Sequence, residues 1–191
     1  MKKTLWIIAI GLIFFQGNAQ KFAKLDKSPM DRAYYPANAA IRNFEKTDEK
    51  KKAAEPKIRV TYSRPSKKGR TIFGELLKFK EPWRIGANES TEVIFMTDVV
   101  FGGTTIEAGR YSLIAIPEQN QWTLHINTLL DGWGNYGYDP SLNIASITAT
   151  TQKSKTIIEY LSMALYKAAE NTVHLKIGWD DTFAEFPITI K

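Results

Sequence analysis

Apolar and polar residues alternate with a period of two from residue 58 to the end of the chain, and this pattern most limits the possible fold. Successive side chains of a β-strand point to opposite faces of its sheet, so each alternating run fits a strand with one buried face. The runs cover residues 58–63, 91–96, 110–115, 122–127, 173–179 and 184–190. The chain is therefore expected to fold mainly as β-sheet.

Turn-forming residues separate these runs. Gly102-Gly103 can adopt positive φ and predicts a tight turn between two short strands. Ala108-Gly109 and Pro117–Asn120 predict further turns, and Asp180-Asp181 predicts a turn between the last two strands. We expect an all-β fold, an antiparallel β-sandwich or flattened barrel of about 8–9 short strands with little helix.

The first nineteen residues have the layout of a secretory signal peptide. Lys2 and Lys3 precede an apolar run, Leu5–Phe15, which ends in small and polar residues at Ala19. The run is shorter than the ~20 residues that span a bilayer as a helix; an uncleaved anchor is the alternative. We expect residues 1–19 to be a signal peptide and the protein to be exported, periplasmic or secreted, with no transmembrane segment in the mature chain.

The rest of the chain divides at residue 57. Residues 20–57 are rich in proline and charge and are expected to form an N-terminal arm or linker. We favour docking of Met30–Pro36 on the domain through Tyr34 and Tyr35, and a mobile leader is the alternative. Residues 58–191 are expected to form a single β domain. The chain has no cysteine, which excludes disulfides and thiolate sites, so an ordinary apolar core must hold this domain together.

Charge argues against a nucleic-acid partner. The formal net charge of +6 includes Lys2 and Lys3, so the mature chain is only mildly basic. The basic run Lys50–Lys52 lies among acidic residues and is expected to be solvated linker.

The segment 62–91 gathers arginine, glycine, proline and tryptophan in a stretch that is mostly not strand, with residues 76–81 expected to be loop. A long loop in a compact domain is either functional or ordered by its own contacts. In a structural interpretation, which we favour, Arg64, Arg70 and Arg84 clamp the loop to carboxylates and carbonyls, and Trp83 fills the core. In a binding interpretation, the same residues line a cleft for an anionic group, with Asn88 and Glu89 orienting the ligand.

At these residues the chain resembles the exported bacterial proteins catalogued as domain of unknown function family 2911. The resemblance rests on Tyr62–Pro65, Lys68–Arg70, Ile72–Gly74, Trp83-Arg84, Gly86–Glu89, Gly109–Leu113, Ile116-Pro117, Trp122-Thr123, Trp133-Gly134 and Tyr138-Asp139, with a leader at Leu25–Asp31. The family has no established activity, so the resemblance implies export but supplies no functional residues.

Residues 156–170 fit two secondary structures. Their helical spacing and their alanine, methionine and lysine content slightly favour a helix. The resemblance implies alternating strands here, which favours a strand instead.

The segment Trp133–Asp139 is a second candidate site. Trp133, Tyr136 and Tyr138 lie among glycines and predict either a platform on which a sugar ring stacks or an aromatic plug at a barrel mouth.

Catalytic motifs are sparse. Neither histidine, His125 or His174, has a closely spaced metal-ligating neighbour, and no phosphate-binding loop is present, so we expect neither a metal nor a cofactor. We favour a non-catalytic binding or accessory module of the cell envelope, with a glycan or an envelope protein as its ligand. The alternatives are a hydrolase of an envelope or extracellular polymer, using Glu89, Asp139 or His125, and a structural subunit with an exposed apolar patch.

Overall fold

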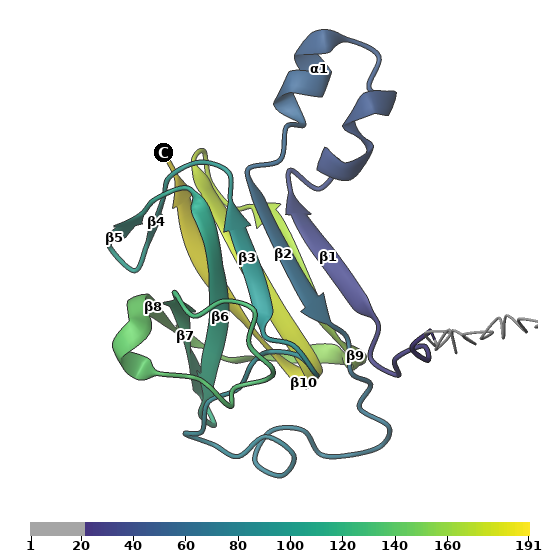
Figure 1. Cartoon of the computed structure of the whole chain (residues 1–191), viewed down its shortest axis with the longest axis vertical. Coiled ribbons are helices and arrows are strands. Elements are labelled where there is room, and N and C mark those ends of the chain that lie inside the picture. Colours follow the sequence, from purple (N-terminus) through teal and green to yellow (C-terminus); the bar gives the residue numbers. More distant parts are fainter. Residues whose placement is uncertain (1–21) are drawn as a thin grey trace, which may run out of the picture.

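The computed structural model describes residues 22–191, and the predicted signal peptide lies outside the described residues. Ten strands form two antiparallel sheets (Figure 1). The first sheet has the order β1-β2-β3-β6-β7-β8, and the second has the order β5-β4-β10-β9. The predicted all-β antiparallel sandwich with little helix is therefore confirmed.

The elements in chain order are β1 (Met30–Tyr35), η1 (Ala39–Phe44), α1 (Asp48–Ala53), β2 (Ile58–Ser63), β3 (Thr91–Phe95), β4 (Val99–Phe101), β5 (Thr104–Ile106), β6 (Gly109–Pro117), β7 (Gln121–Asn127), η2 (Pro140–Leu142), β8 (Asn143–Thr150), β9 (Gln152–Lys167) and β10 (Thr172–Ile190). Most strands are short, as expected, but β9 and β10 have 16 and 19 residues.

One apolar core joins the inner faces of the two sheets. Val60 of β2, Leu124 of β7 and Ile177 of β10 are fully buried members of it. These residues lie at the positions that the period of two assigns to the buried faces. Large aliphatic side chains each contribute about 1.5–3 kcal/mol when buried, so this core supplies the main favourable term in a chain without disulfides.

Residues 156–167 form strand, not helix. They belong to β9, which pairs with β10 from Lys167↔Val173 onward. Leu161, Met163 and Leu165 of β9 face the core and are buried, whereas the residues between them are more exposed. Pairing and burial override the helical propensity of this segment, as tertiary context often does.

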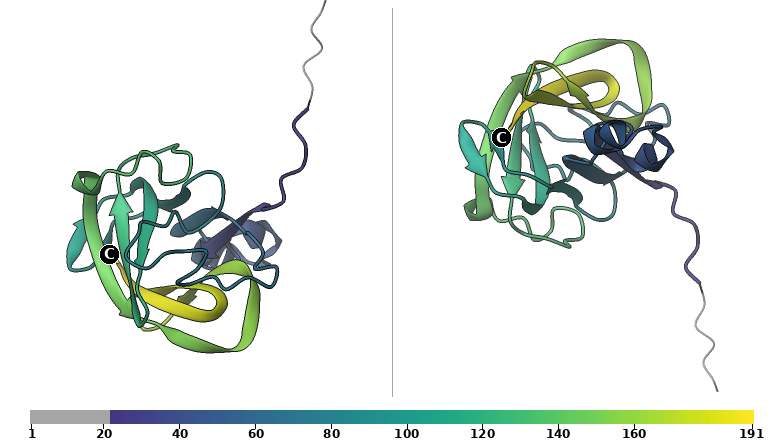
Figure 2. Two further views of the ribbon diagram at one scale, coloured as in Figure 1. Left: turned by 90° about the horizontal axis from the view of Figure 1, so that it is seen from below. Right: turned by 90° about the horizontal axis from the view of Figure 1, so that it is seen from above.

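The prediction of a turn at Asp180-Asp181 between two strands is wrong, because β10 runs through both residues as one strand. The pairing of β10 with β9 shifts register on both sides of Asp180, which has a φ of 58°. Aspartate tolerates positive φ, so the residue that suggested a turn instead forms an irregularity that bends the strand. Figure 2 shows β10 curving sharply at one side of the sandwich.

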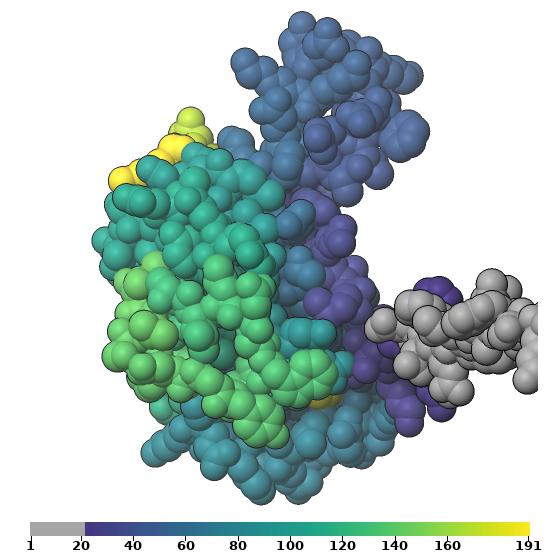
Figure 3. All heavy atoms as spheres, viewed as in Figure 1, coloured from purple at the N-terminus to yellow at the C-terminus, as the bar shows by residue number. Residues whose placement is uncertain are grey.

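The segment expected to be an arm contributes an edge strand. All six residues of β1 pair with β2, and Tyr34 and Tyr35 are half-buried. Between these strands, η1 and α1 form a small helical projection that stands away from the sandwich (Figure 3). The Thr47 hydroxyl caps α1 by accepting the Lys50 N–H at 3.3 Å. No helix in the described part of the chain is long and apolar enough to cross a membrane.

Gly102 and Gly103 form the tight turn between β4 and β5 that the sequence predicted. Gly102 and Gly103 both have positive φ, but a Cβ on Gly102 would overlap the Ser146 carbonyl oxygen of β8, whereas a Cβ on Gly103 would meet nothing. We expect Gly103→Ala to lower the free energy of unfolding by about 1–2 kcal/mol, the cost of a left-handed alanine. Gly102→Ala should lower it by more than about 3 kcal/mol, because overpacking adds to that strain. Denaturant unfolding measures both, and equal losses would contradict this packing.

Candidate functional site

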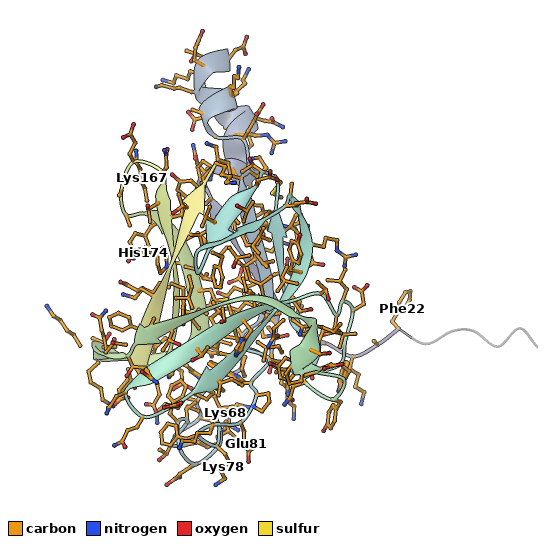
Figure 4. All side chains as sticks on the ribbon, turned by 90° about the vertical axis from the view of Figure 1, so that its left-hand side faces the viewer. Phe22, Lys68, Lys78, Glu81, Lys167 and His174 are labelled. Atoms are coloured by element: carbon orange, nitrogen blue, oxygen red, sulfur yellow. The ribbon has the colours of Figure 1, made fainter. Side chains whose placement is uncertain are left out.

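Residues 64–90, here called the closing loop, cover one end of the sandwich (Figure 1). The loop first pairs with β9: the Lys67 N–H donates to the Glu159 carbonyl at 2.7 Å, and the Leu161 N–H donates to the Pro65 carbonyl at 3.0 Å. Lys68, Lys78 and Glu81 lie at the end of the molecule opposite to Lys167 (Figure 4).

The register shift in β9 explains why the loop docks there. Ser162 pairs with Gly178 and Ile158 pairs with Asp180, so three residues of β9 stand opposite Trp179 alone. Their backbone groups cannot all bond to β10. The closing loop supplies the missing partners, and the Trp179 indole N–H also donates to the Glu159 carbonyl at 3.3 Å.

Arg64 fastens the start of the loop. Its guanidinium donates to the Leu161 carbonyl at 3.1 Å, to the Asp31 carboxylate at 2.8 Å and to the Ser162 hydroxyl at 2.9 Å. Arg64 thus links β1 to β9 across the gap between the two sheets. These are the contacts of a structural clamp, as in the structural interpretation of the segment.

Trp83 fastens the other end of the loop. Its backbone exchanges two hydrogen bonds with Ala115 of β6, at 2.8 and 2.9 Å. Its side chain is 4% exposed and stacks on Trp179 of β10 with ring centroids 6.3 Å apart, while its edge meets Trp122 of β7 at 5.8 Å. Trp83 therefore wedges between the two sheets and closes the end of the core.

Two hollows lie between the closing loop and this wedge. One has a volume of about 350 Å³ and the other about 200 Å³, and Leu76, Leu77, Trp83 and Arg84 line both. The larger is also lined by Ser28, Pro65, Arg70, Gly86, Ala87 and Trp179, and the smaller by Lys78, Glu81, Pro82 and Asn135. Because they share a wall, we treat them as one site, here called the loop cavity.

Two residues that line the loop cavity carry buried hydrogen-bond donors without acceptors. Four buried side-chain nitrogens in residues 22–191 lack a hydrogen-bond partner, and two of them are Trp83 Nε1 and Arg84 Nε, on adjacent residues. Arg84 also takes part in no ion pair of the described chain. A buried donor without an acceptor costs about 1–3 kcal/mol, so this pair is an unusual feature in a stable domain.

The backbone beside these donors is strained. Ile85 is fully buried and has a φ of 53°. A β-branched residue in this left-handed region is a true outlier, with a cost of about 1–2 kcal/mol. The Thr91 hydroxyl, which donates to the Ile85 carbonyl at 2.9 Å, helps to hold this conformation. Strain of this kind is concentrated at functional sites.

The cavity brings together three of the predicted site residues. Arg70, Trp83 and Arg84 line it, with Arg70 held by donation to the Lys67 and Ser66 carbonyls at 2.9 and 2.6 Å. Arg64 lies outside it as a clamp. Asn88, with a φ of 60°, and the exposed Glu89 belong to the end of the loop and do not line the cavity.

The three predicted aromatic residues lie beside the cavity without lining it. Trp133 and Tyr136 are 61% and 88% exposed, so they do not plug the end of the sandwich. Tyr138 is half-buried, and its hydroxyl accepts a hydrogen bond from the Asn143 side chain at 2.8 Å.

Sequence reasoning missed the apolar walls of the cavity. Leu76 and Leu77 were expected only to be loop, and Trp179 only to be core. Two adjacent leucines in a predicted loop were the available signal, because a solvated loop has no need of them. Ser28 and Asn135 carried no comparable signal.

The residues considered for hydrolysis have separate local roles. Asp139 accepts the Ser141 N–H at 2.8 Å and so caps η2, and hydrogen bonding from the Ser141 side chain and from this N–H lowers the pKa of its carboxyl. His125 lies on β7, where burial lowers the pKa of its imidazole. Within residues 22–191, no three His, Asp or Glu side chains are grouped as a metal site would require.

Comparison with known proteins agrees with the resemblance noted from the sequence. The family model described as "Protein of unknown function (DUF2911)" matches residues 45–188, which is most of the chain. The chain therefore belongs to this family. Neither the curated proteins nor the solved structures contain a match. The family match covers both the closing loop and the aromatic segment, so both candidate sites belong to the family domain.

Stability measurements distinguish the two types of arginine. We expect Arg64→Met to lower the free energy of unfolding by about 1–2 kcal/mol, since it removes three hydrogen bonds at a partly solvated position. Arg84→Met should not lower it by more than about 1 kcal/mol and is expected to raise it, because no protein hydrogen bond is lost and an unsatisfied buried donor is removed. Thermal and urea unfolding provide the comparison, and a larger loss for Arg84→Met would make Arg84 a clamp.

Acid should weaken the attachment of the loop to β9. The Lys68 N–H donates to the Glu159 carboxylate at 2.9 Å, and this bond above all lowers the pKa of Glu159 below its ordinary value of 4.5. A carboxyl whose pKa is lower when folded stabilises the protein above its unfolded pKa, and this contribution is lost as pH falls through the folded pKa. Between about pH 6 and pH 3, the free energy of unfolding of the wild type should therefore fall more than that of Glu159→Gln. Parallel stability curves would contradict this assignment.

Proposed function

We propose that this protein is a binding module whose loop cavity takes the carboxylate of a ligand with an apolar or ring-shaped body. The observation that carries the proposal is the pair of buried donors, Arg84 Nε and Trp83 Nε1, which lack partners in the described chain. An acceptor group entering the cavity would meet the Arg84 guanidinium, of which only Nε is fully buried.

Charge favours an anionic group. Arg84 is a cationic side chain that has no carboxylate partner in the described chain. A guanidinium presents a planar fork of donors that matches a carboxylate, and hydrogen bonds to charged groups contribute about 1.5–3 kcal/mol. Arg70 also lines the cavity, although its Nε and one terminal nitrogen already donate to carbonyls. Of the two arginines only Arg84 has a side chain without a hydrogen bond to the described chain, and its planar fork of donors matches the two oxygens of a carboxylate.

The walls favour an apolar or ring-shaped body on the ligand. Leu76, Leu77 and Pro65 form apolar sides, and Trp83 and Trp179 supply aromatic surface. Ligand sites typically combine such walls with a few polar groups that fix orientation. The strained Ile85 holds Arg84 between these walls, which agrees with a preformed site.

We further propose that the protein acts outside the cytoplasm and takes its ligand from the cell envelope or its surroundings. This part rests on residues 1–19 and their resemblance to a signal peptide.

Phenylacetate and phenylacetamide test the proposal, since they have the same shape and differ in charge. With the purified protein at constant ionic strength, we expect phenylacetate to bind at millimolar concentration and to shift the Trp83 indole N–H resonance in ¹H–¹⁵N NMR spectra. Phenylacetamide should bind roughly tenfold more weakly, and this preference should vanish in Arg84→Gln.

Arg42→Gln is the matched control. It removes the same charge from the helical projection, where Arg42 donates to the Ala39 carbonyl. The preference for phenylacetate should persist in this variant. Equal binding of acid and amide, absence of binding, or an unchanged preference in Arg84→Gln would each overturn the proposed function.

A further inference from the structure

We propose that the loop cavity continues onto an aromatic platform formed by Trp133 and Tyr136, and that its ligand is an acidic saccharide of more than one sugar unit. This inference rests on the proposed function and names the ligand class. The cavity would take the carboxylate of one unit, and the platform would stack against a neighbouring ring.

The segment that carries the platform is held in place by hydrogen bonds. The Ser90 hydroxyl lies 2.6 Å from the Gly134 carbonyl and 3.2 Å from the Gly132 carbonyl, and the Ser90 N–H donates to Gly132 at 2.9 Å. The Asn135 side chain donates to the Pro82 carbonyl at 2.9 Å. The backbone under Trp133 is therefore fixed to the closing loop, although the aromatic rings themselves are open to solvent.

The platform borders the free guanidinium. A Cβ built on Gly134 would lie 3.3 Å from the Arg84 terminal nitrogen and 3.5 Å from the Tyr136 ring, so Arg84 packs directly beneath this glycine. Asn135 lines the smaller hollow. Figure 3 shows the surface of residues 130–140 lying directly against that of the closing loop. One ligand of two or three rings can thus contact both places.

The exposed aromatic groups need an explanation. Two large aromatic side chains, 61% and 88% exposed, on a segment tied down by several hydrogen bonds leave apolar surface in water without adding to the core. The faces of aromatic rings carry partial negative charge, and the C–H groups on a sugar ring are weakly positive, so flat stacking is favourable. A uronic acid unit combines such a face with the carboxylate that Arg84 lacks.

A peptide fits these features less well. Peptides bind in extended form mainly through backbone hydrogen bonds to a free strand edge. Beside the cavity, the backbone groups of Gly132, Gly134 and Pro82 already accept hydrogen bonds from Ser90 and Asn135. The open platform also lacks the enclosed pocket that an apolar side chain requires. The observations therefore favour rings that stack over a chain that pairs.

Calorimetric titrations of the purified protein with galacturonate, trigalacturonate and triglutamate separate these cases. We expect trigalacturonate to bind roughly fivefold more tightly than galacturonate, a gain typical of one aromatic contact. Trp133→Ala and Tyr136→Ala should each reduce this gain and leave galacturonate binding unchanged, whereas Arg84→Gln should weaken both sugars. Phe44→Ala, which removes an aromatic group of similar exposure from η1, should change neither.

The possible failures are distinct. If phenylacetate binds through Arg84 but galacturonate and trigalacturonate do not bind, or if trigalacturonate shows no gain, the saccharide assignment is wrong and the carboxylate site stands. If triglutamate binds as tightly as trigalacturonate with the same dependence on Trp133, the ligand class is peptide. If none of the carboxylates binds, both proposals fail. Circular dichroism of each variant confirms that folding is retained, as the exposure of Trp133 and Tyr136 leads us to expect.

Discussion

The loss of register between β9 and β10 is the constraint on which the rest of the structure depends. A regular pairing of these strands would use the backbone groups of Glu159, Tyr160 and Leu161 within the second sheet. Because three residues of β9 face Trp179 alone, the Glu159 carbonyl and the Leu161 N–H bond instead to Lys67 and Pro65, where the closing loop begins. Irregularities of this kind often lie beside functional sites, where they redirect side chains. Here the irregularity fixes one end of a loop whose other end is fixed by Trp83.

Trp83 fixes the second end of the closing loop and so creates the loop cavity between the loop and the end of the core. Its backbone pairs with the first sheet and its ring stacks on the second, so the chain on either side must arch over the end of the core. Arg84 follows directly and is held by the strained Ile85 beside apolar walls, where its Nε finds no partner. A protein fold normally removes unsatisfied buried donors. Two neighbouring ones on residues that line a cavity are the observation from which we propose a binding function.

The sequence predicted the sheets better than it predicted their connections. Period two identified the buried faces of β2, β7 and β10 correctly, because alternation directly reports which side of a strand meets the core. It failed at Asp180, because aspartate with positive φ suits a turn and a bulge equally. Trp83 and Arg84 stood out by composition. Trp83 is a wedge because it contacts β6 and β10, which are distant in sequence, and no local pattern encodes such contacts. Nor does any local pattern show that Arg84 lacks a partner. The same holds for Arg64, which resembles Arg84 in sequence yet bonds to three partners.

Ser28 lines the cavity from the segment that precedes β1, and this position has a thermodynamic consequence. Residues 22–27 are exposed, and the nearest hydrogen bond is local, from the Ser28 N–H to the Asp26 carboxylate. If a ligand orders this segment, linkage requires the reverse effect by the same factor: whatever restrains the N-terminal residues alters affinity at the cavity. Attachment, cleavage or capture of the residues before Ser28 would then change how much ligand the loop cavity binds, with no change in any residue of the β-sandwich.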